Sequence, residues 1–230
     1  THIPGVQPRI TLDEFYECEI AVKESHEFRA ALVKRGITDL DLVMVDPWSA
    51  GNFGVEEEKG VRLSFARCWL RAGPTDNGYA RPIEGVIPVV DLNKMEVIRV
   101  EDHGVVALPP NDGNYAAEFM DNFRTDLKPL EIVQPEGPSF NVAGNEVSWQ
   151  KWNFRVGFTP REGLVLYTIS YEDQGRKRPI IYRASLGDMV VPYGDPSPRN
   201  IRKNAFDVGE YGIGNLANSL TLGCDCLGQI

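Results

Sequence analysis

Two carboxylic acids, Asp207 and Glu210, lie among apolar and glycine residues in the stretch AFDVGEYGIG at positions 205–214. A carboxylate that is buried without a partner costs several kcal/mol. An acid in this setting therefore either sits at a solvated turn, which the nearby glycines would allow, or has a chemical task. In the second case burial would raise the pKa of Asp207 and make it a general base. The local residues leave both interpretations open.

A paired-acid mechanism, as in glycoside hydrolysis, is a third interpretation of the same two residues. On a β-strand, however, positions i and i+3 point to opposite faces. Asp207 and Glu210 would then not share a cleft, which argues against this chemistry.

The cysteines and histidines do not form a recognisable metal site. The four cysteines and three histidines are Cys18, Cys68, Cys224, Cys226, His2, His26 and His103. The histidines show no ligand spacing, and the Cys-x-Cys pair would need further ligands. We therefore expect no metal site within this stretch, and four cysteines are too few for a disulfide scaffold.

The bulk composition is that of a globular protein with an acidic surface. Of the 230 residues, 42% are hydrophobic and 25% charged, and the formal net charge is −9. An acidic chain repels phosphate backbones, so nucleic acid is not an expected partner. No apolar run reaches the ~18 residues of a membrane span. The first residues lack a signal-peptide pattern, which predicts a cytoplasmic location, with the reservation that a trimmed N-terminus would look the same.

The elements that must position any site begin with two helices. Residues 11–23 start with the capping-box pattern TLDE, and residues 26–35 follow Ser25 as N-cap and precede Gly36. Four alternating segments then predict strands at 41–46, 61–70, 84–92 and 95–102. Two helices followed by a meander indicate an α+β domain, with both helices on one face of a four-stranded antiparallel sheet.

The remainder divides into a connector and a β-rich part. Residues 103–138 are loop-like and rich in proline towards their end, apart from a short helix expected at 115–123. From residue 139 onward alternating segments follow one another, including one over 146–159 and the basic hairpin tip at 175–179. We expect a small domain at 1–120, a linker at 121–138 and, at 139–230, the opening of a large, mostly antiparallel β-sandwich domain.

Several long strings in the second half, in this order, carry a resemblance to one family. They are QPEGPSF, REGLVLYTISY, RASLGDMVVPYGDPSP and NAFDVGEYGIGNLANSLTLGCDCLG, preceded in the first half by PGVQPRIT and DLVMVDPWSAG. These strings resemble the copper-containing, topaquinone-dependent primary amine oxidases, including the small α+β domain of their bacterial members. The resemblance implies oxidation of primary amines by dioxygen to aldehydes, with release of ammonia and hydrogen peroxide.

The same resemblance implies roles for individual residues. Asp207 matches the family's catalytic base, and the apolar neighbours Ala205 and Phe206 would raise its pKa. Ala205 also matches a gate position in the substrate channel, and Phe206 beside it is expected to line the same channel. Tyr193 matches a tyrosine whose hydroxyl hydrogen-bonds an oxygen of the quinone. Tyr79 matches an aromatic residue that lines the channel.

Other parts of the family pattern are missing from this stretch. The tyrosine that forms topaquinone and the histidine ligands of copper(II) are expected in sequence beyond Ile230, which implies that this stretch is a fragment of the enzyme. Cys226 matches a family cysteine whose disulfide partner is also expected there. The resemblance further implies a homodimer. The alternative is a non-catalytic β-sandwich binding module, in which Asp207 is a structural acid.

Overall fold

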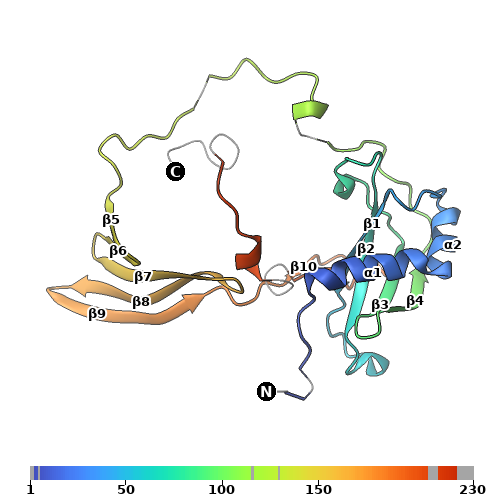
Figure 1. Ribbon diagram of the computed structural model, residues 1–230, viewed down its shortest axis with the longest axis horizontal. Coiled ribbons are helices and arrows are strands. Elements are labelled where there is room, and N and C mark those ends of the chain that lie inside the picture. The colour runs from blue at the N-terminus through green and yellow to red at the C-terminus, as the bar shows by residue number, and fades with distance from the viewer. Residues whose placement is uncertain (1–2, 5, 115–116, 129, 207–211, 222–230) are drawn as a thin grey trace. The chain divides into compact units, whose positions relative to one another are not determined.

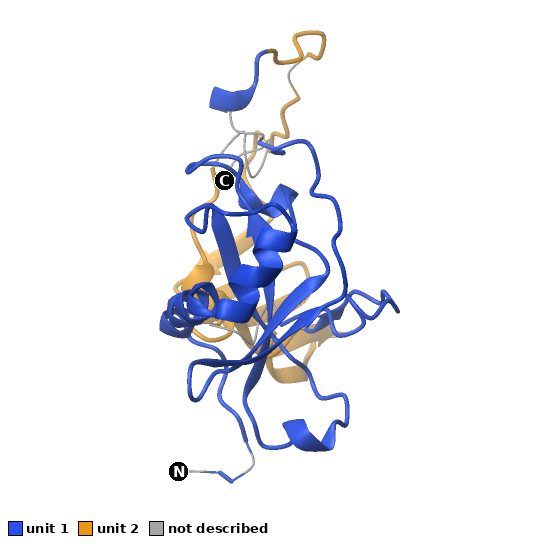
Figure 2. Ribbon diagram, turned by 90° about the vertical axis from the view of Figure 1, so that its right-hand side faces the viewer, with its two compact units in different colours: residues 1–121, 190–210 blue, residues 122–189, 211–230 orange. Residues whose placement is uncertain are grey.

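The computed structural model describes residues 3–4, 6–114, 117–128, 130–206 and 212–221. The chain divides into two compact units, shown in blue and orange in Figure 2. The first unit comprises Thr1–Asp121 together with Val190–Glu210, and the second comprises Asn122–Met189 and Tyr211–Ile230. The first unit therefore joins the small α+β domain to a segment that follows it by about seventy residues.

Two helices open the first unit, as the sequence predicts: α1 (Leu12–Glu24) and α2 (His26–Lys34). At the start of α1 the Thr11 backbone N–H donates to Glu14 Oε2 at 2.7 Å, one half of the expected capping box. The Ser25 side chain accepts a hydrogen bond from the backbone N–H of Phe28 and caps α2. Gly36 follows with φ of 73°, so α2 ends as expected.

The helices cover one face of a four-stranded antiparallel sheet of order β1-β2-β3-β4 (Figure 1). Its strands are β1 (Val43–Ser49), β2 (Leu63–Leu70), β3 (Val86–Asp91) and β4 (Glu96–Asp102). Strand β1 continues to Ser49, beyond the predicted end at residue 46, and it contains Pro47. Because β1 is an edge strand, a proline without an N–H donor is tolerated there.

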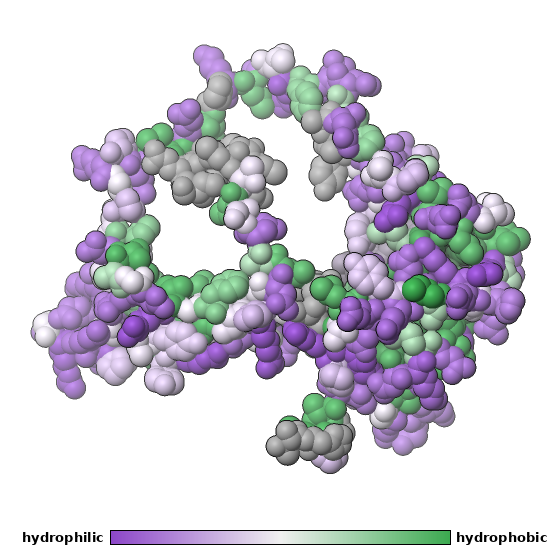
Figure 3. All heavy atoms as spheres, viewed as in Figure 1, coloured by the Kyte–Doolittle hydropathy of each residue, from purple (hydrophilic) through white to green (hydrophobic). Residues whose placement is uncertain are grey.

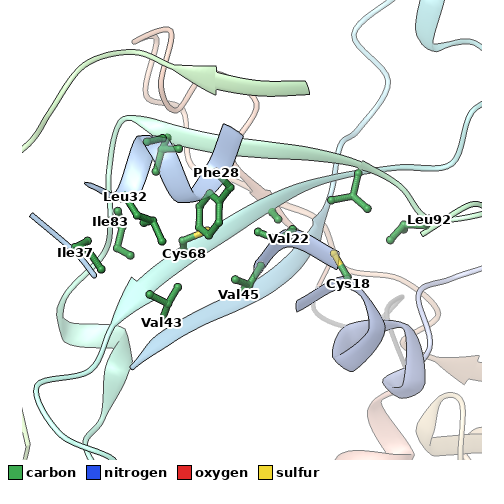
Figure 4. Packing of buried hydrophobic residues seen from close by; sticks show 14 of the residues in the cluster. Cys18, Val22, Phe28, Leu32, Ile37, Val43, Val45, Cys68, Ile83 and Leu92 are labelled. Atoms are coloured by element: carbon green, nitrogen blue, oxygen red, sulfur yellow. The ribbon is translucent and has the colours of Figure 1, made fainter. Parts of the chain in front are cut away.

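The core of the first unit lies between the helices and this sheet (Figure 4). Phe28 and Leu32 of α2 and Val22 of α1 are fully buried against Val43 of β1 and Cys68 of β2. At about 25 cal/mol per Å² of apolar surface, each such side chain contributes on the order of 1.5–3 kcal/mol. The helix-facing surface of the sheet is therefore closed by this core, and only the opposite surface can face a ligand.

The second unit contains a five-stranded antiparallel sheet of order β5-β6-β7-β8-β9. Its strands are β5 (Phe140–Ala143), β6 (Glu146–Trp149), β7 (Trp152–Thr159), β8 (Gly163–Asp173) and β9 (Arg176–Ser185). The single strand expected over 146–159 is wrong, because the chain reverses where Trp149 pairs with Trp152. Gln150 adopts φ of 54° in this two-residue turn, a conformation that its residue type does not signal.

Short elements complete the described parts of the chain. They are the 3₁₀ turns η1 (Glu56–Glu58), η2 (Gly78–Ala80), η3 (Ala117–Phe119) and η4 (Ile213–Leu216), and the paired strands β10 (Val191–Pro192) and β11 (Asn204–Ala205). Within the described part of 115–123 only η3 forms, so the helix expected there is not present at that length. A segment this short gains too few hydrogen bonds to offset helix nucleation without a packed face.

The surface of the first unit is mainly hydrophilic. On the face drawn in Figure 3, hydrophilic side chains cover most of the first unit, with smaller hydrophobic areas between them. None of the helices in the described ranges is long and apolar enough to cross a membrane.

Candidate functional site

The face of the four-stranded sheet that points away from the helices carries a row of functional side chains. In β1 the inward positions are Val43 and Val45, so the period of two places Asp46 and Trp48 on the outer face. In the partner strand Cys68 points inward, which places Arg67 and Trp69 on the same outer face. Sheet alternation, rather than any local motif, therefore brings these four residues together.

Residues 190–206 pack on this outer face within the first unit. Strand β11 contacts β1, and the Asn204 amide donates to the Ser49 carbonyl oxygen at 3.4 Å. Arg67 Nη1 donates to the backbone oxygen of Arg199 at 3.2 Å. Residues from the two parts of the unit therefore form one continuous surface.

Four aromatic rings form a continuous row across this surface. Tyr193 lies 5.7 Å from Trp48, Trp48 lies 6.3 Å from Trp69, and Trp69 lies 5.1 Å from Tyr79, measured between ring centroids. Such tilted and edge contacts each add roughly 0.5–1.5 kcal/mol beyond burial. The row connects Tyr193, expected at the quinone, with Tyr79, expected in the substrate channel.

Contacts to its aromatic ring hold the Tyr193 side chain in place. Besides Trp48, the Lys203 ammonium lies 4.7 Å from the ring centroid, and the Tyr193 N–H donates to the Lys203 carbonyl oxygen at 3.1 Å. The side chain is half exposed, and its hydroxyl makes no hydrogen bond to any residue in the described ranges. A tyrosine fixed through its ring with a hydroxyl available to accept or donate suits the predicted contact with a quinone oxygen, which stays a prediction.

Tyr79 lies at the other end of the row, in η2. The Asn77 side chain accepts a hydrogen bond from the Tyr79 N–H, and the Tyr79 hydroxyl donates to Asp46 Oδ2 at 3.1 Å. Burial raises the pKa of Asp46, and the Tyr79 hydrogen bond opposes that rise. The predicted channel residue thus has an acidic neighbour that the sequence interpretation did not single out.

Basic side chains gather beside Tyr193. Lys203 lies over Trp48 as well, at 5.7 Å, and burial together with the charge of Arg67 lowers the pKa of Lys203. Arg67 is buried, and its Nε makes no hydrogen bond within the described residues. The two cations border a small pocket that Arg199 and Asn200 also line.

The residues around the predicted base are only partly described. Ala205, the predicted gate, is buried in β11, where it pairs with Val191 of β10. Phe206, which precedes Asp207, is half-buried. Asp207 and Glu210 lie outside the described residues, as do Cys224 and Cys226, so the positions of the base and of the disulfide cysteine stay predictions. The other two cysteines, Cys18 and Cys68, are buried free thiols.

No cluster of three or more histidine, cysteine, aspartate or glutamate side chains suited to a metal ion occurs in the described ranges. These residues therefore do not fit a copper site. The expectation that the copper ligands lie in sequence outside this stretch stands as a prediction.

Comparison with known proteins identifies the two parts of the chain. Residues 13–119 match the family described as "Copper amine oxidase, N3 domain", and residues 141–230 match "Copper amine oxidase, enzyme domain". The fold agrees: a copper-containing benzylamine oxidase from Hansenula polymorpha, known as a crystal structure, superposes with a TM-score of 0.73 at 34% identity. That match covers 99% of this chain and 36% of the other.

Curated relatives give the same family. The chain is 56% identical over 226 residues to a primary amine oxidase of Arthrobacter sp. (strain P1), and 52% identical over 236 residues to a copper-containing diamine oxidase of Nicotiana tabacum. These matches cover 98% and 99% of this chain but only 35% and 30% of the relatives. The chain belongs to the copper amine oxidase family, an enzyme family, and it spans about a third of the length of these relatives.

The family resemblance points to Tyr79 and Tyr193 but not to the residues between them. Trp48, Trp69 and Asp46 occur in the predicted strands at 41–46 and 61–70 or just after them. Their period-two spacing places them on the strand face opposite the buried positions, and this spacing is the one sequence signal that they share a face. The spacing alone does not identify functional residues, because side chains that only face solvent have the same spacing.

Proposed function

We propose that the protein containing this chain oxidises primary amines to aldehydes, with release of ammonia and hydrogen peroxide at the expense of dioxygen. The observation that carries the proposal is the match to both the N3 domain and the enzyme domain, the second of which includes the stretch around Asp207. Relatives at 56% and 52% identity are named as a primary amine oxidase and a diamine oxidase, which supports an amine substrate.

In this proposal Asp207 is the general base. It removes a proton from the carbon next to the amine nitrogen, and it must lie within hydrogen-bonding distance of that proton. Ala205 is buried and Phe206 is half-buried, and apolar neighbours of this kind would raise the pKa of an adjacent carboxylate. A base near pKa 4 would be weak, so the apolar neighbours raise the basicity of Asp207.

The remaining residues of this chain orient the reacting groups. Tyr193 directs its hydroxyl to a quinone oxygen, and the ring contact with Trp48 restricts its movement. Tyr79 and the aromatic row guide the amine along the sheet. Topaquinone and copper(II), which the family implies, would supply the electron sink and the redox chemistry when bound. Both groups, and the contacts of the proposed homodimer, depend on sequence outside this stretch.

The test uses the complete protein with Asp207→Asn. General base catalysis contributes roughly 10²–10⁴-fold, so anaerobic bleaching of the quinone absorbance by a primary amine should slow by about that factor. Asp188→Asn, an exposed aspartate of the same domain without a hydrogen-bonded side chain in the described contacts, is the control and should bleach at the parent rate. Bleaching of the Asp207→Asn protein at the parent rate would make Asp207 a structural acid.

Measurements on the unsubstituted protein distinguish the oxidase from the alternative function, a non-catalytic binding module. A binding module would show no visible quinone absorbance and would produce no peroxide from any primary amine. Either result would remove the proposed oxidase activity.

A further inference from the structure

The aromatic row on the outer face of the four-stranded sheet consists only of tyrosine and tryptophan rings. Its order is Tyr193, Trp48, Trp69 and Tyr79, with successive ring centroids 5.7, 6.3 and 5.1 Å apart. Tyrosine and tryptophan rings give up a single electron far more readily than phenylalanine or aliphatic side chains do. Rings that touch exchange an electron faster than rings separated by other protein atoms. The row therefore connects its two ends for electron transfer as well as for packing.

The two ends of the row have different surroundings. Tyr193, which is half exposed, is the ring that the proposed function places at the quinone, where dioxygen is reduced to hydrogen peroxide. The Tyr79 ring at the other end is 57% exposed, whereas Trp69 beside it is only 7% exposed. The row thus leads from the expected oxygen chemistry, through a buried ring, to a ring that a soluble reductant can reach.

The Tyr79 hydroxyl already donates to a proton acceptor. It lies 3.1 Å from Asp46 Oδ2, within the range for proton transfer. A phenol that loses an electron becomes a strong acid, so oxidation of Tyr79 is easiest when its proton can leave at the same time. Burial raises the pKa of Asp46, which makes its carboxylate a better proton acceptor than a solvated aspartate.

The turn that carries Tyr79 holds its hydroxyl near this carboxylate. The Asn77 side chain accepts a hydrogen bond from the Tyr79 N–H at 3.3 Å, and the Asn77 N–H donates to the Asn114 side chain at 2.8 Å. The donor and the acceptor of the proton therefore need no rearrangement before transfer.

Charged side chains favour the loss of an electron at the Tyr79 end of the row. The Lys203 ammonium lies 4.7 Å from the Tyr193 ring centroid and 5.7 Å from that of Trp48. A cation this close disfavours the positive charge that forms when either ring loses an electron. Asp46 places the opposite charge beside Tyr79. An electron is therefore drawn from Tyr79 towards Tyr193, rather than in the reverse direction.

We propose that the aromatic row carries electrons from Tyr79 to Tyr193 and so protects the enzyme from oxygen radicals formed during its own reaction. This proposal rests on the proposed amine oxidase function, which supplies hydrogen peroxide. Hydrogen peroxide that takes one electron from a reduced transition-metal ion gives a hydroxide ion and a hydroxyl radical. The hydroxyl radical takes one electron from the Tyr193 ring and becomes a second hydroxide ion.

The electron lost by Tyr193 is replaced from Tyr79 through Trp69 and Trp48, and the Tyr79 hydroxyl proton passes to Asp46. The balance is one neutral tyrosyl radical at Tyr79 and one protonated carboxyl group. A soluble reductant such as ascorbate returns one electron to this radical, and Asp46 returns the proton. The oxidising equivalent is thereby moved from the reacting groups to a ring where it can be repaired.

The experiment maps oxidised residues by peptide mass spectrometry in the complete, cofactor-containing enzyme after treatment with hydrogen peroxide and no amine. A hydroxyl-radical scavenger in solution suppresses direct attack on exposed rings. In the parent, oxidation products should gather on Tyr79 and spare Tyr193. Trp69→Phe interrupts the row and should lower the ratio of oxidised Tyr79 to oxidised Tyr193 by about tenfold or more, since even ~1.4 kcal/mol of added barrier has that effect.

Two further variants keep the test independent of how well Trp69→Phe folds. Trp48→Phe interrupts the row at a less buried ring and should lower the same ratio to a similar extent. Asp46→Asn leaves every ring in place but removes the proton acceptor and its charge, so the ratio should fall by about tenfold as well. Trp149→Phe is the matched control, because Trp149 is exposed in β6 and lies outside the row. It should leave the ratio at the parent value.

The same enzymes are then allowed to oxidise 2-phenylethylamine in air until they lose activity. Trp48→Phe should become inactive after fewer turnovers than the parent, and ascorbate should prolong the activity of the parent more than that of the variant. Equal ratios of oxidised tyrosines in the parent and the row variants, or no oxidation of either tyrosine, would overturn the proposal and leave the oxidase function intact. The expected ratios in an enzyme that forms no peroxide from any amine would support the electron path and overturn the oxidase function.

Discussion

Arg202 forms a bidentate ion pair with Glu58, which lies 144 positions earlier in the chain. Arg202 Nη1 lies 3.0 Å from Glu58 Oε1, and Nη2 lies 2.7 Å from Oε2. The guanidinium lies 4.0 Å from the centroid of the Phe65 ring, and both charged side chains are largely buried. This pair fastens residues 190–206 to the outer face of the small domain. Through that segment it positions Tyr193 and Lys203.

Arg202→Met should therefore destabilise the first unit. The substitution removes the two hydrogen bonds to Glu58 and a third to the Ala50 carbonyl oxygen, and it leaves Glu58 with Arg99 as its remaining cation, at 2.9 Å. Removing one partner of a largely buried pair costs about 3 kcal/mol or somewhat less. Urea unfolding followed by tryptophan fluorescence measures the change, since Trp48 and Trp69 both lie in this unit.

Lys59→Met is the control for the Arg202 experiment. The Lys59–Glu56 pair has side chains that are 63% and 77% exposed, so its loss should change stability by less than about 0.5 kcal/mol. Equal destabilisation by the two substitutions would mean that the Arg202–Glu58 pair does not hold the segment in place.

A second prediction concerns acid stability. Arg62 donates to both carboxylate oxygens of Glu14, and this hydrogen bonding lowers the pKa of Glu14 from 4.5 to about 2. Because the folded-state pKa is depressed, the stabilisation is complete above the unfolded pKa near 4.5 and is lost as pH falls towards about 2. Over that window the contribution is on the order of 2–3 kcal/mol.

Glu14→Gln should consequently lower stability at pH 7 and have a diminishing effect as the pH approaches 2. The measurement is a series of urea unfolding curves between pH 2 and pH 7 for the parent and the variant. Parallel stability profiles across this range would contradict the assignment of the lowered pKa to Glu14.

A third prediction concerns two glycines with similar backbone angles and different surroundings. Gly85 has φ of 78° and Gly36 has φ of 73°. A Cβ on Gly85 would lie 2.2 Å from the Gly104 carbonyl oxygen, whereas a Cβ on Gly36 would meet no atom within 4 Å. Alanine at either position adopts an unfavourable left-handed conformation, which costs roughly 1–2 kcal/mol.

Gly85→Ala must also displace backbone, so it should destabilise the protein by about 1–3 kcal/mol more than Gly36→Ala. Chemical denaturation of both variants gives the difference directly. If the two substitutions have equal effects, the backbone near Gly104 yields at little cost and the close approach is not structurally required.

The local parts of the fold could be predicted from sequence because their causes are local. Thr11 and Ser25 mark the helix starts, and period-two alternation marks the strands of both sheets. The packing of residues 190–206 could not be predicted in this way. Its contacts join Arg67 to Arg199 and Ser49 to Asn204, pairs separated by 132 and 155 positions, and no local periodicity encodes such partners.

The candidate site also contains some residues that the sequence predicts and others that depend on distant contacts. Strings that resemble a family predict Tyr193, Tyr79 and Asp207, whereas no feature of the sequence points to Asp46. Its significance depends on a hydrogen bond from η2 and on rings contributed by three separate segments. A single acid in a predicted edge strand carries no signal of that kind, since most aspartates are solvated.

The division of the first unit between Thr1–Asp121 and Val190–Glu210 has a consequence for synthesis on the ribosome. Helices α1 and α2 and the four-stranded sheet emerge first and can close their shared core at once. The outer face, which carries Phe65 and Arg67, stays uncovered until about seventy further residues have been synthesised and the segment that begins at Val190 emerges. At ~5–20 residues per second this interval lasts several seconds. A nascent chain that stalls within it presents an uncovered aromatic and cationic surface to chaperones.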